Sequence, residues 1–178
     1  MKIKVSDITD KEKKFDFDGN FTDYPALSDV VKAGECSFLA PISVSISVFK
    51  EFDHIRLYGK IGTKIELLCS RCLSNFNRDI SSTFTVFYSE ADRDIIEDEV
   101  ELAEEDLLSS TYIGDEIDLT DLISGQVIME LPYKSLCSEE CLGLCPICGT
   151  DLNKSSCDCS SQKGSFAFEA LKGLKLKQ

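Results

Sequence analysis

The chain has 178 residues, of which 43% are hydrophobic and 29% are charged, and this composition suits one modest core with a small appended module. It contains no run of ~18 apolar residues that could cross a membrane, and its first residues, MKIKVSD, lead into no apolar stretch of a secretory signal. We therefore expect neither a membrane protein nor an exported one, but a protein of the reducing cytoplasm, where free thiols persist.

The amino-terminal half shows mainly strand patterns. Phe15, Phe17 and Phe21 indicate one edge strand, and Tyr24–Lys32 indicates a short helix or turn. In Phe38–Lys50 apolar and polar residues alternate with a period of two, which predicts a half-buried strand with one polar face. Its apolar positions are Ile42, Val44, Ile46 and Val48, and its polar positions are Ser43, Ser45 and Ser47.

Further strands are predicted after this one. His54–Lys60 and Thr63–Leu68 flank Ile61–Gly62, where the glycine permits a tight reversal, so the two segments are interpreted as a hairpin. Phe76–Tyr88 is rich in Thr, Phe, Val and Tyr and predicts another long strand. Successive strands with short turns predict an antiparallel β domain over residues 1–89, a meander curled into a small open barrel.

An acidic segment separates this domain from the rest of the chain. Glu90–Asp121 contains fourteen Asp and Glu residues and a single basic residue, Arg93, so it carries the whole formal charge of −13 and the remainder is neutral. Residues 90–117 are therefore interpreted as an acidic linker. Two roles stay open, because such a run is either solvated and disordered or a surface that meets a basic partner.

An amphipathic helix is predicted in residues 118–135. Apolar residues recur there at intervals of three and four, behind possible caps at Asp118 or Thr120, and Pro132 ends the pattern. Its apolar face should cover one side of the sheet, giving an α+β fold. Phe166–Leu176 indicates one more short helix. The apolar positions of the first helix are Leu119, Leu122, Ile123, Val127 and Leu131.

Six cysteines fall between positions 137 and 159, and this density favours metal ligands over disulfides in a reducing compartment. Cys145 and Cys148 form a CxxC turn that starts with proline and is followed by glycine, the form of a zinc knuckle. Cys157 and Cys159 can supply the other pair of one four-thiolate site. Residues 136–178 are thus predicted to be a zinc ribbon-like module with a carboxy-terminal tail.

A second CxxC turn, Cys69 and Cys72, lies between two predicted strands. If Cys137 and Cys141 come near it, the chain has eight ligands for two Zn²⁺ ions, with Cys36 left over. Pairing of this turn with Cys145 and Cys148 fits the sequence equally well. Three other possibilities also remain for the metal content, which are one ion with spare thiols, an iron–sulfur cluster, and no metal at all. A redox pair is a further alternative, although it requires a helix after the first cysteine.

Enzymatic signatures are missing from the sequence. It has no GxxxxGK[ST], GxGxxG, GxSxG or HExxH motif, and its single histidine, His54, lies in a predicted strand where it is interpreted as a surface or packing residue. A four-thiolate zinc site has no open position for water, which disfavours metal-assisted hydrolysis. We therefore expect no catalytic residues, and a binding or assembly factor.

Several of these motifs together resemble the YceD family in the cysteine-rich form found in many Gram-positive bacteria. The resemblance runs over Ile65–Cys159 and is carried by the CSRC turn at Cys69, the run Asp115–Leu119, the helix end Met129–Pro132 and the run Cys137–Asn153. It implies a role in the synthesis, processing or accumulation of 23S (large-subunit) ribosomal RNA, without established catalysis. One departure is Ser165–Leu171, where family members often carry Asp-Pro-Arg before a terminal helix.

The charge pattern limits how such a role could be carried out. RNA binding normally needs a basic stripe, and the lysines and arginines here are scattered. The aromatic residues Phe84, Phe87 and Tyr88 are interpreted as core rather than as stacking platforms for bases. We therefore expect the acidic segment to meet a ribosomal or RNA-processing protein with a basic surface, and ribosomal RNA is a second candidate partner. The alternatives are a zinc-ribbon protein that binds single-stranded RNA and a thiol redox sensor.

Overall fold

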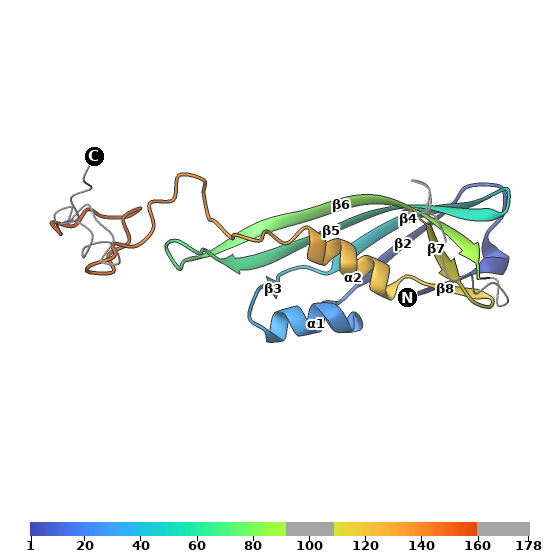
Figure 1. Cartoon of the computed structure of the whole chain (residues 1–178), viewed down its shortest axis with the longest axis horizontal. Helices are drawn as coiled ribbons and strands as arrows, with labels where there is room; N and C mark the ends of the chain where they lie inside the picture. Colours follow the sequence, from blue (N-terminus) through green and yellow to red (C-terminus); the bar gives the residue numbers. More distant parts are fainter. Residues whose placement is uncertain (92–108, 160–178) are drawn as a thin grey trace, which may run out of the picture.

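The computed structural model describes residues 1–91 and 109–159, which form a long curved sheet with two helices against one face (Figure 1). The cysteine-rich segment lies beyond one end of this sheet, next to the tip of the β5–β6 hairpin. The elements are β1 (Lys2–Lys4), β2 (Lys13–Gly19), α1 (Pro25–Lys32), β3 (Ser37–Phe38), β4 (Ile42–Glu51), β5 (His54–Leu68), β6 (Asn75–Glu90), β7 (Ser109–Tyr112), β8 (Glu116–Asp118) and α2 (Thr120–Met129), with short 3-10 turns at Val5–Asp7 and Phe21–Asp23.

The main sheet follows the order β2-β4-β5-β6-β7, with β3 paired to β5 beyond the end of β4. β2, β4, β5 and β6 are antiparallel neighbours, which confirms the predicted meander. β7 runs parallel to β6, and within the described residues β2 and β7 form the two open edges. The sheet is therefore mixed, because β7 joins it from outside the predicted antiparallel domain 1–89, and it is open rather than curled into a barrel. β1 and β8 form a separate antiparallel pair.

The predicted reversal at Ile61–Gly62 is wrong, because β5 is one continuous strand. Gly62 lies in its interior, where the Ser43 hydroxyl donates a hydrogen bond of 2.9 Å to the Gly62 carbonyl. A Cβ atom on Gly62 would lie 3.2 Å from that hydroxyl, so the glycine serves a close approach between strands. The actual turn lies between β4 and β5 at Phe52, which has a φ of 56°.

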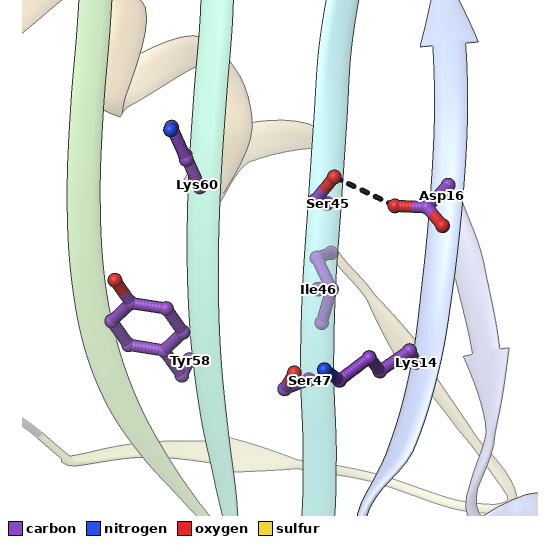
Figure 2. A pocket seen from close by; sticks show the side chains of 7 residues that line it. All are labelled: Lys14, Asp16, Ser45, Ile46, Ser47, Tyr58 and Lys60. Atoms are coloured by element: carbon purple, nitrogen blue, oxygen red, sulfur yellow. Dashed lines mark hydrogen bonds between the residues drawn. The ribbon is translucent and has the colours of Figure 1, made fainter.

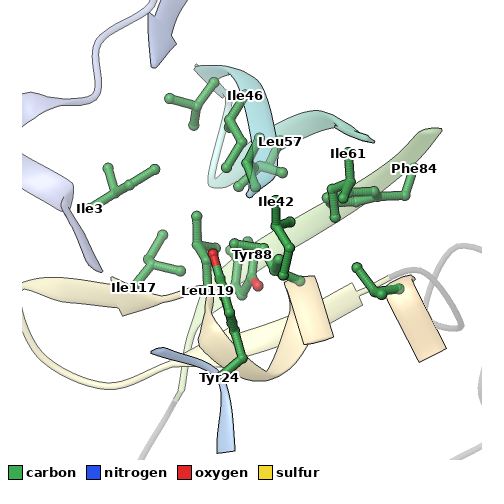
Figure 3. Close-up of a cluster of buried hydrophobic side chains, with 14 of the residues drawn as sticks. Ile3, Tyr24, Ile42, Ile46, Leu57, Ile61, Phe84, Tyr88, Ile117 and Leu119 are labelled. Carbon is green, nitrogen blue, oxygen red and sulfur yellow. The ribbon is translucent and has the colours of Figure 1, made fainter. Parts of the chain in front are cut away.

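The core lies between the sheet and the helices, and Figure 3 shows its central side chains. The period of two predicted for β4 is confirmed, since Ile42, Val44, Ile46 and Val48 are all buried. α1 adds Leu27, and α2 covers the sheet as predicted with Leu119 at its start and Ile123 and Val127 within it. Neither helix among the described residues is long and apolar enough to cross a membrane. The helix predicted at Phe166–Leu176 lies outside the described residues.

The opposite face of the sheet is polar and carries a shallow depression of about 320 Å³ over β2, β4 and β5 (Figure 2). The Ser45 hydroxyl donates a hydrogen bond of 2.6 Å to Asp16 there. The rest of the lining is Lys14, Ile46, Ser47, Lys60 and the half-exposed ring of Tyr58. This face mixes positive and negative charges. It therefore presents no basic stripe.

Candidate metal centres

The structure brings the eight predicted cysteines together as two separate groups of four. Within each group the four sulfur atoms all lie within 4.8 Å of one another. The alternative in which the two CxxC turns share one site is not the arrangement observed. Cys36 belongs to neither group, and burial beside Ile65, Leu67 and Ile80 raises the pKa of its thiol. The first tetrad is Cys69, Cys72, Cys137 and Cys141, and the second is Cys145, Cys148, Cys157 and Cys159.

The first CxxC turn closes the hairpin between β5 and β6. The Cys69 N–H donates to the Ser74 carbonyl at 2.9 Å, and the Leu73 N–H donates to the Cys69 carbonyl at 3.0 Å. Leu73 takes a φ of 56°, in the left-handed region. This tight turn brings Cys69 and Cys72 to the same group of four sulfurs.

The second CxxC turn repeats the same backbone pattern. The Cys145 N–H donates to the Thr150 carbonyl at 2.8 Å, and the Gly149 N–H donates to the Cys145 carbonyl at 2.9 Å. Gly149 has a φ of 74°, so it matches the left-handed residue of the first turn. The two CxxC turns thus share one backbone form, with a left-handed residue directly after the second cysteine.

A hydroxyl group accompanies the second cysteine of each turn. Ser74 Oγ lies 2.9 Å from Cys72 Sγ, and Thr150 Oγ1 lies 3.1 Å from Cys148 Sγ. The Thr150 hydrogen bond is the main cause that lowers the pKa of Cys148 to about 6, whereas the hydrogen bond with Cys148 raises the pKa of Cys159 to about 12. In the sequence, the shared pattern C-x-x-C-x-[S/T] is the signal that marks these two hydroxyl groups.

The first tetrad shows the same division between its thiols. Burial opposes ionisation of Cys69, but N–H groups, first that of Cys137 and then those of Cys72 and Arg71, lower its pKa to about 6. Hydrogen bonding with Cys141 is the main cause that raises the pKa of Cys137 to about 12. Within each tetrad the hydrogen bonds thus favour the thiolate at one cysteine and the thiol at another, and an incoming cation displaces the remaining protons.

The spacing of the sulfur atoms fits a tetrahedral metal ion. A zinc–sulfur bond of about 2.3 Å in tetrahedral geometry places the sulfurs about 3.8 Å apart. In the first tetrad the sulfurs of Cys69 and Cys141 are 3.8 Å apart, and those of Cys72 and Cys137 are 3.7 Å apart. Each tetrad offers four sulfurs, which suits a structural site without a position for water. The two tetrads can therefore hold metal ions, and their role as zinc ligands is a prediction.

The two tetrads differ in their surroundings. Cys69 and Cys141 are buried, and Phe76, Leu136 and Leu144 pack around the first tetrad. The second tetrad is more open, because Cys148 is exposed and Cys157 and Cys159 are half-buried. The first tetrad thus attaches the cysteine-rich segment to the tip of the hairpin, and the second lies further out.

The predicted acidic segment is described only in part. Residues 92–108 lie outside the described residues, while Glu90, Asp115, Glu116 and Asp121 are exposed. Glu90 ends β6, and Asp115 and Glu116 lie at the start of β8, at the end of the sheet opposite the cysteines, whereas Asp121 lies in the first turn of α2 (Figure 1). His54 is also at that end, where its ring packs edge-on against Phe87 with centroids 5.4 Å apart, in agreement with the predicted packing role.

Comparison with known proteins gives related sequences. A family described as "Large ribosomal RNA subunit accumulation protein YceD" matches residues 57–175. The chain is similar to "Large ribosomal RNA subunit accumulation protein YCED homolog 1, chloroplastic" of Arabidopsis thaliana, with 28% identity over 156 residues, 76% of this chain and 49% of that protein. The Zea mays protein of the same name is 30% identical over 145 residues, 67% of this chain and 48% of that protein.

An uncharacterised protein of Mycobacterium tuberculosis is 33% identical over 117 residues, 64% of this chain and 52% of that protein. The chain thus spans about half the length of the curated relatives it matches. No solved structure matches it. The region matched by the family includes both tetrads, β6, α2 and most of β5.

Proposed function

This chain belongs to the YceD family, and on that premise we propose that it is a non-enzymatic factor for the accumulation of 23S ribosomal RNA. In this proposal it acts through a ribosomal or RNA-processing protein with a basic surface, in a reducing compartment such as the cytoplasm. Two Zn²⁺ ions, one in each cysteine tetrad, hold the segment 136–159 in shape.

The chemistry of the donor sets supports a non-enzymatic role. Each tetrad presents four sulfurs, so a bound Zn²⁺ would have no open position at which to activate water. The metal, when bound, supplies a cross-link between distant parts of the chain. Cys69 and Cys72 bring the hairpin tip to that cross-link, and Cys137 and Cys141 bring the segment that follows α2.

The single observation that supports a basic protein as the partner is the separation of charge along the chain. The acidic segment Glu90–Asp121 has a balance of −13, and the rest is neutral. Its described acids are exposed at the end of β6, around β8 and at the start of α2, whereas the outer face of the sheet mixes Lys14 and Lys60 with Asp16. A phosphate backbone needs a positive surface, so a basic protein complements this molecule better than naked RNA does.

Charge-neutralised variants test the partner. One variant changes four exposed acids of the acidic segment to amides, Glu90→Gln, Asp115→Asn, Glu116→Gln and Asp121→Asn. A control variant with the same net charge changes four exposed acids elsewhere, Asp18→Asn, Asp29→Asn, Glu35→Gln and Asp79→Asn. Each replaces the native protein in cells, and the 23S ribosomal RNA level is measured together with salt-dependent capture of proteins identified by mass spectrometry.

We expect the first variant to lose basic partners and to lower the 23S ribosomal RNA level, while the control keeps both. Equal loss from the two variants would show that net charge alone matters. If the native protein and both variants bind purified ribosomal RNA equally well without any other protein, the proposal is contradicted and the chain is an RNA-binding protein.

Metal content tests the other part of the proposal. Protein purified without oxygen should contain two zinc ions per chain by native mass spectrometry. Metal-free protein with an intact fold and a reversible disulfide would instead identify a thiol sensor.

A further inference from the structure

The two tetrads are joined by a linker of three residues, Leu142, Gly143 and Leu144, because Cys141 belongs to the first and Cys145 to the second. This linker is held from both sides. The Leu144 N–H donates to the carbonyl of Arg71 at 3.1 Å, and the Gly143 carbonyl accepts the N–H of Leu152 at 2.9 Å. Arg71 lies inside the first CxxC turn, and Leu152 lies in the loop that follows the second.

The side of the linker that faces the first turn is closely packed. Gly143 has a φ of 77°, and a Cβ atom there would lie 3.0 Å from the Arg71 carbonyl oxygen. The Arg71 guanidinium donates from Nη1 to the carbonyls of Glu139 at 3.1 Å and Cys141 at 2.9 Å. The backbone that presents Cys141 to the first tetrad is therefore fixed to the turn that presents Cys69 and Cys72.

Asn153 contacts the linker on the side that faces the loop of the second tetrad. It lies between Cys148 and Cys157, in the loop of the second tetrad, yet its Nδ2 donates to the sulfur of Cys141 in the first tetrad at 3.4 Å. Its Oδ1 accepts the N–H of Leu142 at 2.8 Å, and Nδ2 also donates to Asp151 at 2.8 Å. One side chain thus connects the loop of one tetrad to a ligand atom of the other.

We propose that the two tetrads form one thermodynamically coupled two-metal centre, in which Asn153 is the positioning residue that raises the affinity of the first tetrad once the second is occupied. This inference rests on the proposed metal occupancy. An ion in the second tetrad fixes both ends of the loop 149–156, so Asn153 no longer has to be ordered when Cys141 binds its ion. An N–H donated to a thiolate also stabilises its charge and orients the sulfur. Coupling of this kind is reciprocal between the two sites.

Co²⁺ is a suitable probe, because its absorption bands report four-thiolate coordination while native mass spectrometry counts ions. Two single-tetrad variants of the full chain, Cys69→Ser with Cys72→Ser and Cys148→Ser with Cys157→Ser, give the affinity of each tetrad alone. In the native chain the population with two ions should exceed the product of these separate occupancies. Loss of the second tetrad should weaken the first by about tenfold or more.

Asn153→Ala should remove this excess while two Co²⁺ ions still bind at saturation. In the variant that lacks the first tetrad, Asn153→Ala should leave the affinity of the second tetrad unchanged, which a general loss of structure would not do. Asn77→Ala, at an exposed asparagine on β6, is the matched control and should titrate like the native chain. Asn153→Ser, which keeps a hydroxyl for the Leu142 N–H, replaces the alanine variant if that variant does not fold.

The native chain, compared with the two single-tetrad variants, decides between coupling and independence. Two ions bound with the product of the single-tetrad occupancies would overturn the coupling and leave the proposed metal occupancy intact. Unchanged coupling in the Asn153 variants would overturn the role of this residue. A chain that binds no Co²⁺ or Zn²⁺ would overturn both the coupling and the metal part of the proposed function.

Discussion

Gly143 lies where the linker between the tetrads passes against the backbone of Arg71, so a single added methyl group tests that contact. Gly143→Ala would combine an unfavourable φ with a Cβ atom 3.0 Å from the Arg71 carbonyl. Gly34→Ala is the matched control, because Gly34 has a φ of 76° and open space around it. We expect a loss of about 1 kcal/mol in the free energy of unfolding for Gly34→Ala and about 2 kcal/mol or more for Gly143→Ala, measured by urea denaturation. Equal losses would argue against a tight linker.

Gly59 provides a second residue-level prediction, this time in the sheet. A Cβ atom at this position would lie 2.2 Å from the ring of Phe84, which is buried in the core. Gly59→Ala should therefore lower the free energy of unfolding by about 2 kcal/mol or more. Gly62→Ala should cost much less, because its nearest neighbour is the rotatable Ser43 hydroxyl. Phe84→Leu in the Gly59→Ala background should recover part of the loss, and no recovery would exclude a clash with this ring.

The cysteines illustrate what single residues do and do not reveal in a sequence. All eight tetrad members were identifiable, because thiols this dense in one chain favour metal coordination. Their division into two sets matches one of the two pairings that the sequence left open, since spacing along the chain does not say which turns meet in space. Ser74 and Thr150 indicate that the two CxxC turns belong to separate sites, because each turn has its own hydroxyl group beside its second cysteine. Asn153 gave no such signal, as its contact with Cys141 depends on the folded linker.

At the scale of elements, the strands were predictable where burial alternates. β4 was identified because its apolar residues face the core and its serines face solvent. The reversal predicted at Gly62 failed because a glycine marks either a turn or a close approach, and the sequence alone does not separate the two. The turn at Phe52 falls in the gap between the predicted strands Phe38–Lys50 and His54–Lys60, although no glycine or asparagine stands at its left-handed position.

Helix α2 offers a test of how the sheet is covered. Ile123 is fully buried against the core, whereas Ile128, on the same helix, is 36% exposed. Both substitutions to alanine gain the same small helix propensity, so their difference reports burial. Ile123→Ala should lower the free energy of unfolding by about 2–5 kcal/mol, and Ile128→Ala by about 1 kcal/mol or less. Similar losses in thermal or urea denaturation would mean that α2 does not cover the core.

At the scale of the whole molecule, metal removal should separate the chain into a stable and an unstable part. The sheet and its helices share a large apolar core, whereas the apolar residues packed on the first tetrad are Phe76, Leu136 and Leu144. After chelation, amide hydrogen exchange should become fast in residues 136–159 and stay slow in β4 and β5. Loss of protection throughout the sheet would show that the metal centres hold the entire fold together.

The thiol groups predict the pH dependence of metal binding. At neutral pH Cys137 and Cys159, whose pKa values are raised to about 12, keep their protons until a cation displaces them. Metal uptake should therefore release protons, and affinity should rise with pH. It should fall most steeply below about pH 6, where Cys69 and Cys148 are protonated as well. A pH-indicator titration with Zn²⁺ measures the release, and uptake without released protons would exclude coordination by these thiols.

Strand β6 runs for 16 residues from Asn75, beside the first CxxC turn, to Glu90, where the acidic segment begins. At about 3.3 Å per residue this strand is about 50 Å long, and the two ends of the molecule are correspondingly far apart (Figure 1). β6 therefore acts as a spacer between the two ends of the molecule. Two small binding partners can occupy its opposite ends without colliding, and any single particle that touches both must itself be at least as long as the spacer.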